Sequence, residues 1–408
     1  MTDTIAIAIA IADDREARRN ALILSVANSV TGSSPIIAFS LGGLAGIYLL
    51  GPDKSLATLP ISFFVVGGAL GAIPAAMLMN RIGRRAGFIV GASFGILGGL
   101  VCGLAVLIAS FPVLVAGFAI IGIANSFVNQ YRFAAADAGS PALRAKAISW
   151  VLAGGVVAGI LGPQAVIYTR HLFDPVPFVG GFLAIAVFSV VGMLLLLPLS
   201  GAARERPKTA VRTGGRLLIE IVRQPRFIVS LVCAIGAYGL MSLVMTAAPL
   251  AMVGCGLGQD NAALGIQWHV LAMFAPSFFT GSLIARFGKE TIVAIGLALL
   301  ASCAVIALLG IDLWHFWAAL ILVGLGWNFG FIGATAMLTE TYRPEERSKV
   351  QGFNDFVLFS LVAVASFSSG ALFSNLGWAA LNMVVFPVVA VCALALALTL
   401  LGGRWKPA

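Results

Sequence analysis

Charged side chains are scarce in this sequence. Asp, Glu, Lys and Arg make up 10% of the 408 residues, whereas hydrophobic residues make up 60%. An ordinary soluble domain carries roughly 25% charge. A soluble fold of this length has too little interior for so much apolar surface, but a lipid bilayer is itself an apolar solvent. The composition therefore predicts an all-α protein that crosses a membrane several times.

The motifs of enzymes and of disulfide-rich secreted proteins are also missing. There is no P-loop, HExxH or GxSxG motif, so neither ATP-driven transport nor hydrolysis is supported. The five cysteines lie in apolar stretches without a CxxC pair, which excludes a disulfide framework. Asp13, Asp14 and Glu16 argue against a cleaved secretory signal at the N-terminus. We expect a transporter without an enzyme cofactor, driven by an ion gradient or by the solute gradient itself.

Twelve apolar segments are long enough to cross a bilayer as helices, which takes about 20 residues each. They cover approximately residues 20–50, 57–79, 87–109, 112–138, 147–169, 177–199, 226–254, 262–285, 290–310, 313–338, 350–374 and 377–401. One long polar stretch, 200–225, divides them six and six. This division predicts two related six-helix bundles, 20–199 and 226–401, joined by a linker at 200–225 and flanked by tails at 1–19 and 402–408.

The distribution of Lys and Arg predicts the orientation. If the N-terminus is cytoplasmic, 22 of the 25 Lys and Arg residues fall on the cytoplasmic side, in agreement with the positive-inside rule. Lys54 and Arg170 fall outside, and Arg132 lies within a segment. The sequence thus predicts that both termini and the linker are cytoplasmic.

Two basic loops occupy equivalent places in the two halves. The first runs from Asn80 to Arg85, and the second from Gly281 to Lys289. They resemble the loop signature of the major facilitator superfamily, which has a Gly, an Asp and then Arg-x-Gly-Arg-Lys; Asn80 and Ala285 replace the Asp. The resemblance covers the whole chain and implies the major facilitator fold, with two bundles that rock around a central cavity. The candidate gating residues are Arg81, Gly83, Arg84, Arg85, Gly281, Arg286, Gly288 and Lys289, although positive-inside charge alone also explains the basic ones.

Sulfur-bearing side chains gather on one face of the seventh segment. At 3.6 residues per turn, Met241, Met245 and Met252 fall within roughly 40° of one another. Cys255 lies close to this stripe, and Cys233 lies farther round the same side. The eighth segment carries His269 and Met273, which share a helix face because they are four residues apart. We expect these thioethers and the imidazole to meet near mid-membrane.

Such a neutral set of soft ligands is suited to Cu(I). The sequence around MxxxM (Met241, Met245) and HxxxM (His269, Met273) resembles the CcoA-like copper transporters, a bacterial branch of the major facilitator superfamily. That resemblance implies copper import across the bacterial cytoplasmic membrane. Methionine packing, with His269 serving in packing or as a proton relay, is the alternative for the same residues.

The same branch includes proteins described as riboflavin transporters that carry these motifs, so riboflavin or another small aromatic solute is the alternative cargo. A flavin needs aromatic stacking and amide-like hydrogen bonds. The candidate cavity residues are Asn125, Asn129, Gln130, Tyr131, Gln164, Tyr238, Trp268, Trp327 and Asn328, together with Tyr168. For any one of them, helix–helix packing is the simpler role. A membrane sensor that transports nothing is a third hypothesis, which the lack of a sizeable soluble domain disfavours.

Three charged residues lie near membrane depth: Arg132, Asp137 and Asp355. They are candidates for proton coupling or for a cytoplasmic gate latch. As partners we expect the lipid bilayer and either a copper ion or riboflavin as substrate, no nucleic acid, and a monomeric protein.

Overall fold

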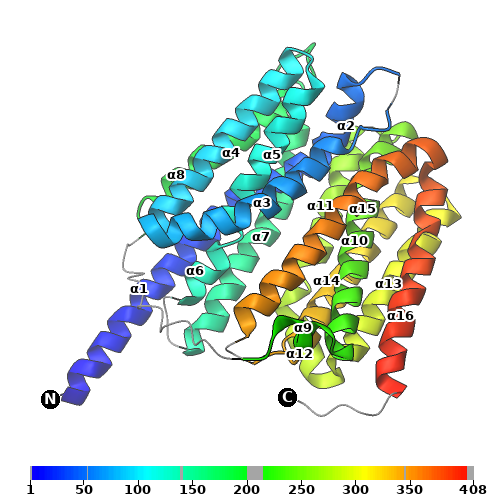
Figure 1. Cartoon of the computed structure of the whole chain (residues 1–408). Coiled ribbons are helices and arrows are strands. Elements are labelled where there is room, and N and C mark those ends of the chain that lie inside the picture. The colour runs from blue at the N-terminus through cyan, green and yellow to red at the C-terminus, as the bar shows by residue number, and fades with distance from the viewer. Residues whose placement is uncertain (1, 53, 138–140, 200–214, 344–345, 402–408) are drawn as a thin grey trace. The chain divides into compact units, whose positions relative to one another are not determined.

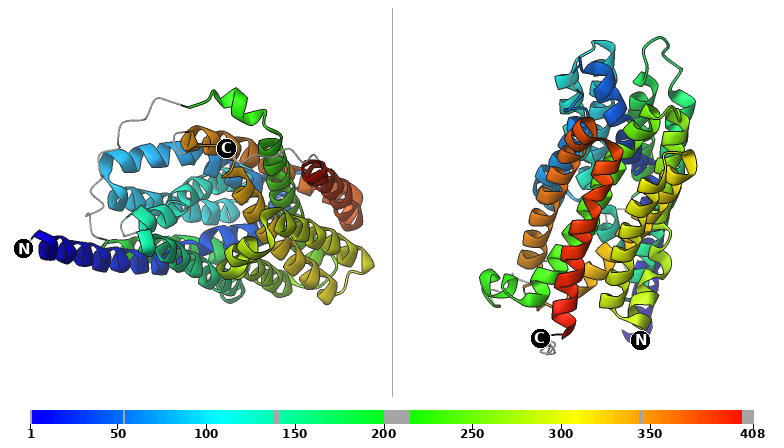
Figure 2. Two further views of the ribbon diagram at one scale, coloured as in Figure 1. Left: turned by 90° about the horizontal axis from the view of Figure 1, so that it is seen from below. Right: turned by 90° about the vertical axis from the view of Figure 1, so that its right-hand side faces the viewer.

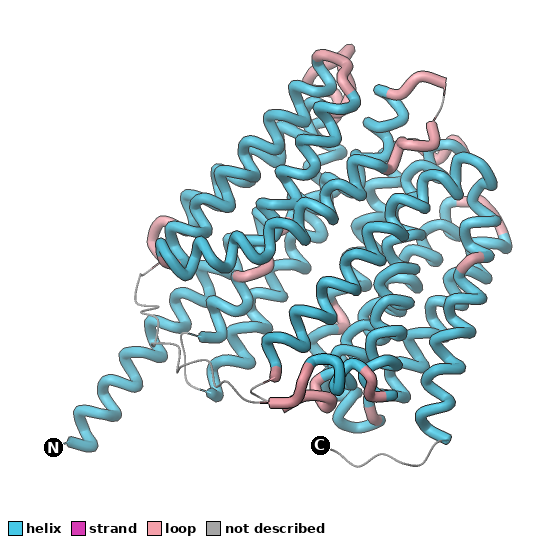
Figure 3. The backbone as a smooth tube through the Cα atoms, viewed as in Figure 1, coloured by secondary structure: helices cyan, strands magenta, loops and turns pink. Residues whose placement is uncertain are grey.

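The structure is a computed structural model that describes residues 2–52, 54–137, 141–199, 215–343 and 346–401. Within those ranges the regular elements are all helices (Figures 1 and 3). The predicted linker 200–225 lies partly outside the described residues, and the predicted tail 402–408 lies wholly outside them. Residues 2–19, predicted as a tail, belong to a helix.

The chain divides into two compact units, residues 1–51 with 63–205 and residues 52–62 with 206–408. The helices of the first half are α1 (Thr2–Thr31), α2 (Ser33–Leu49), α3 (Leu59–Ile82), α4 (Arg84–Leu107), α5 (Phe111–Val128), α6 (Tyr131–Asp137), α7 (Pro141–Thr169) and α8 (Val179–Leu196). Those of the second half are α9 (Leu218–Val222), α10 (Pro225–Gly254), α11 (Gln259–Phe274), α12 (Ser277–Phe287), α13 (Lys289–Leu309), α14 (Leu313–Leu338), α15 (Arg347–Met383) and α16 (Val385–Leu401).

Several of the predicted membrane segments are broken helices. In the described part of the chain, nine helices are long and apolar enough to cross a membrane, α11 and α12 form one further span bent by 43°, and two shorter apolar helices are present. Together these account for the twelve expected segments. The eleventh segment lies in α15, whose backbone turns at Gly377, with a φ of 80°, and most of the twelfth lies in α16. The chain is therefore a multi-pass helical membrane protein.

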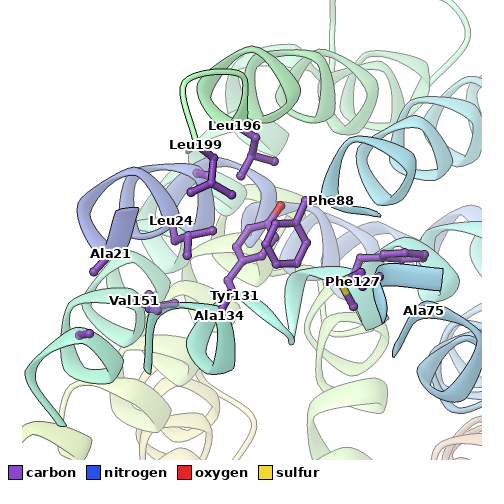
Figure 4. Packing of buried hydrophobic residues seen from close by; sticks show 14 residues of the cluster. Ala21, Leu24, Ala75, Phe88, Phe127, Tyr131, Ala134, Val151, Leu196 and Leu199 are labelled. Carbon is purple, nitrogen blue, oxygen red and sulfur yellow. The ribbon is translucent and has the colours of Figure 1, made fainter. Parts of the chain in front are cut away.

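The first unit has a core of apolar side chains from α1 and from α3 to α8. Phe88 of α4 and Tyr131 of α6 form its centre, with ring centroids 4.7 Å apart and planes at 74° (Figure 4). This edge-to-face geometry is favourable for aromatic pairs. Leu24 and Leu196 close the cluster from α1 and α8. Phe127 and Tyr131 place both sides of the helix break near residue 129 in this cluster.

The second unit is built around α10. This helix packs on α14, α15 and α16, and α16 also packs on α13 (Figure 2). Small residues let helices approach closely in lipid, and α13 and α14 show the effect: a Cβ added at Gly296 would lie 2.4 Å from the backbone nitrogen of Gly330. The second unit therefore holds the predicted sulfur face of the seventh segment at its centre.

Candidate functional site

The three methionines of the predicted sulfur face of α10 are buried. Met241, Met245 and Met252 are all in the core of the second unit. Met252 lies beside α11, since a Cβ added at Gly265 would be 3.3 Å from its sulfur. Met273 on α11 is buried too. The structure thus places the thioethers on adjacent helices in an apolar interior.

His269 is held by α14. Its Nδ1 lies 2.8 Å from the carbonyl oxygen of Leu320, and a Cβ at Gly324 would lie 3.2 Å from the same nitrogen. Because a carbonyl only accepts, Nδ1 carries the hydrogen and Nε2 carries the lone pair. Nε2 is buried without a hydrogen-bond partner in the described structure. No group of three or more His, Cys, Asp or Glu side chains among the described residues is arranged to hold a metal ion.

Cys233 and Cys255, the two cysteines expected near the methionine stripe of the seventh segment, have different surroundings. Cys233 is buried against α16: its thiol donates to the carbonyl of Cys392 at 3.8 Å, and the Cys392 thiol donates to Val232 at 3.6 Å. Cys255, the residue that caps α10, is exposed. Cys233 therefore takes part in packing between α10 and α16, on a different interface from Met252.

An aromatic cluster lies in the second unit and draws on four helices. Tyr238 of α10 has its ring 5.5 Å from Trp327 and 5.2 Å from Phe331, both of α14, and 5.7 Å from Phe359 of α15. Trp327 stacks on Phe331 at 5.3 Å and 17°, and Phe274 of α11 meets Trp327 edge-on at 6.1 Å. We call these five residues the aromatic cluster. Tyr238, Phe331 and Phe359 are only half-buried, so protein does not cover the cluster completely.

Sequence reasoning found two of these five residues. Tyr238 and Trp327 were candidate cavity residues, whereas Phe274, Phe331 and Phe359 were missed. A local signal existed for Phe331, which follows Trp327 by four residues and so shares its helix face. Phe274 and Phe359 come from other helices, and only the packing brings them to the cluster.

Asn328 has a structural role next to the cluster. Its Nδ2 donates to the carbonyl of Met273 at 2.6 Å and to Ser277 Oγ at 2.8 Å, and Thr280 donates to its Oδ1 at 2.6 Å. These partners lie on both sides of the bend between α11 and α12, where a helix end leaves carbonyls unpaired. The Asn328 amide therefore holds the bent span together, and its side chain is fully buried.

The candidate polar residues of the first unit are scattered. Asn125 and Tyr131 line a cavity of about 20 Å³ with Thr31, Ser34 and Ser189, a volume suited to a single water molecule. Of the other candidates, Asn129 and Tyr168 are exposed, whereas Gln130 and Gln164 are half-buried.

Trp268 lies away from the aromatic cluster. Its side chain is 41% exposed, and its ring centroid lies 6.5 Å from Trp317, which in turn meets Trp314. Exposed tryptophans of this kind are typical of membrane interfaces.

The two basic loops share a backbone conformation. Gly83 and Gly288 precede α4 and α13 with φ of 85° and 87°, a conformation that favours glycine. In the second loop, Lys289 pairs with Glu340, which follows α14, and Arg226 of α10 pairs with Glu290 at 2.6 Å. A Cβ at Gly281 would meet nothing within 4 Å, so no close contact depends on that glycine.

The other candidate gating residues lie at the surface. Arg81, Arg85, Arg132, Arg286 and Asp355 are exposed and Arg84 is half-buried. Arg286 lies over the Phe287 ring at 5.2 Å. The side chain of Asp137 is outside the described residues. The candidate coupling residues Arg132 and Asp355 therefore do not form a buried charge centre.

A buried ion pair that the sequence analysis missed fastens the linker to the second unit. The Glu346 carboxylate accepts hydrogen bonds from Arg216 Nε at 3.0 Å and Nη2 at 2.7 Å, and from the backbone nitrogens of Arg216 and Arg343. These donors hold the pKa of Glu346 at about 2, below its usual value of 4.5. Ile221 of α9 is buried nearby against Phe227 and Val350. The linker residues from 216 to 222 are therefore docked on the ends of α14 and α15.

Known proteins and one family model match this chain over nearly its whole length. Residues 21–275 and 262–407 match the family model of the Major Facilitator Superfamily. The chain is 50% identical to the riboflavin transporter RfnT of Brucella anthropi over 388 residues, which cover 95% of this chain and 97% of that protein. It is 30% identical to the uncharacterized MFS-type transporter YddS of Bacillus subtilis over 372 residues, 86% of this chain and 85% of that protein.

Solved structures show the same fold at low identity. The nucleoside transporter NupG superposes with a TM-score of 0.70 at 12% identity, covering 96% of this chain and 100% of that chain. A bacterial homologue of the human lysosomal transporter Spinster superposes with a TM-score of 0.69 at 17% identity, covering 96% and 99%.

Proposed function

The chain belongs to the major facilitator superfamily, and we propose that it imports riboflavin by alternating access. The observation that carries this proposal is the 50% identity, over nearly the full length of both chains, to a riboflavin transporter. The family membership confirms that the chain is a transporter and not an enzyme.

Copper import, the main functional prediction from the sequence, is wrong. The half-identical relative is a riboflavin transporter, so the methionine and histidine motif marks the branch and not the cargo. We interpret Met241, Met245, Met252 and Met273 as core packing, in which flexible thioethers fill irregular gaps.

We assign the aromatic cluster as the candidate surface for the flavin ring. Riboflavin joins a planar tricyclic ring to a polar ribityl chain, and planar rings bind best to offset or edge-on aromatic side chains. Tyr238 and Phe331 are half-buried aromatic rings of the cluster, packed edge-to-face at 5.2 Å. A pocket that is mostly apolar and aromatic, with few polar groups, is the usual form of a small-molecule site.

The charge distribution supports a proposal for the orientation and location of the protein. We propose that the protein lies in the bacterial cytoplasmic membrane as a monomer, with both termini in the cytoplasm, because Lys and Arg gather in the loops on that side. An ion gradient or the riboflavin gradient supplies the driving force.

The experiment is paired uptake of labelled riboflavin and copper by riboflavin-requiring cells that express the chain. We expect riboflavin uptake and rescue of growth, without copper uptake. The double variant Met241→Leu with Met245→Leu should retain riboflavin uptake within about twofold, because Leu and Met have similar volumes. Absence of riboflavin uptake by the wild-type protein, or copper uptake that the double variant abolishes, would overturn the proposal.

A further inference from the structure

Trp327 carries a polar group with no partner inside the aromatic cluster. Its side chain is 8% exposed, and its Nε1 is buried without a hydrogen-bond partner in the described structure. A buried donor without an acceptor is uncommon in folded proteins and costs free energy. An acceptor supplied by a ligand would restore that hydrogen bond.

Two other polar side chains of α14 already have partners within the protein. Both ends of the adjacent Asn328 amide are bonded to residues of α11 and α12. Trp317, on the same helix as Trp327, donates its Nε1 hydrogen to the carbonyl of Asn261 at 3.1 Å. Trp327 therefore differs from these two residues of α14, because no acceptor in the described structure binds its Nε1 hydrogen.

The geometry of the cluster indicates which kind of acceptor fits. An indole N–H lies in the plane of its ring, so its acceptor must approach the ring edge. Phe331 stacks on the Trp327 face, and Tyr238 lies edge-on to both rings. Because Nε1 is buried in this conformation, a flat ligand with a carbonyl at its rim reaches the indole edge only after the helices around the cluster move apart, as alternating access requires.

We propose that Trp327 Nε1–H recognises a ring carbonyl of the flavin and so determines specificity for carbonyl-bearing tricyclic rings. This inference rests on the proposed function, riboflavin uptake. A site built to hydrogen-bond a polar group rejects an analogue that lacks it, because the buried protein group is then left unpaired.

The test is a cycle that alters both partners of the bond. Uptake kinetics are measured for wild-type protein and Trp327→Phe, each with riboflavin and with the 2-thio and 4-thio analogues, in which sulfur replaces one carbonyl oxygen and accepts hydrogen bonds poorly. Phe keeps the aromatic ring and removes the N–H. We expect Trp327→Phe to raise the KM for riboflavin about tenfold, the effect of roughly one lost hydrogen bond. It should leave the KM for one of the two thio analogues unchanged.

Trp317→Phe is the matched control, since it removes an N–H from the same helix whose partner is a backbone carbonyl. We expect it to lower thermal stability without changing the preference for riboflavin over either analogue. If Trp327→Phe changes the KM for riboflavin and both analogues by equal factors, or changes none, the inference is overturned. Lack of riboflavin uptake by the wild-type protein would instead refute the proposed function.

Discussion

Replacing Glu346 by Gln tests whether the buried ion pair stabilises the second unit. The Glu346 side chain is fully buried, and Arg216 is 25% exposed. The pKa of Glu346 is about 2 against a usual 4.5, a difference of about 2.5 units, and each unit corresponds to about 1.36 kcal/mol. That sets an upper limit of about 3 kcal/mol. Solvent around Arg216 screens the pair, so we expect a loss of about 2 kcal/mol in Glu346→Gln.

The assay is thermal or denaturant unfolding of purified protein over a range of pH. Because the folded-state pKa is lowered, the stabilisation is complete above the unfolded pKa, near 4.5, and is lost as the pH falls towards 2. The wild-type protein should therefore exceed Glu346→Gln in stability at pH 6 and lose most of that advantage by pH 3. Glu220→Gln, an exposed carboxyl on α9, should match the wild-type protein. A wild-type advantage that is absent at pH 6, or unchanged at pH 3, would refute the reasoning.

Two further predictions concern packing in the second unit. Gly296→Val should lower the stability of the folded protein by about 1–3 kcal/mol or more, because its Cβ would lie 2.4 Å from the Gly330 nitrogen. Size-exclusion chromatography should show this as a loss of monodisperse protein. Gly281→Ala is the control and should behave as wild type, because the space around its Cβ is open. Asn328→Leu should destabilise the folded protein by about 2–4 kcal/mol, since it leaves the Met273 carbonyl and Ser277 Oγ without their donor. An unchanged melting temperature and unchanged uptake would show that the amide does not hold the bent span.

The helical membrane architecture could be predicted from the sequence because it depends on local composition. Long apolar runs must form helices in lipid, where each backbone group needs a partner within the segment. The breaks within segments were harder. The segment 262–285 was predicted as one span without a break, and only Pro276 marked the position of the 43° bend. The linker was predicted as polar, yet Ile221 is buried in the second unit.

The contacts of the candidate site could not be predicted from sequence patterns. Spacing predicts that His269 and Met273 share a helix face, but it does not fix the rotation of α11 about its axis. In the structure the His269 ring faces Leu320 on α14, a residue 51 positions away in the chain. The aromatic cluster depends on four helices in the same way, so only its Trp327 and Phe331 pair had a local signature.

The burial of the cysteines has a practical consequence. Cys102, Cys233, Cys303 and Cys392 are buried, whereas Cys255 is exposed at the end of α10. A water-soluble maleimide should therefore attach a fluorophore to the native chain at one position, without prior mutagenesis. Because the same helix carries Tyr238 of the aromatic cluster, that fluorophore would give an optical readout of how α10 responds when a solute binds.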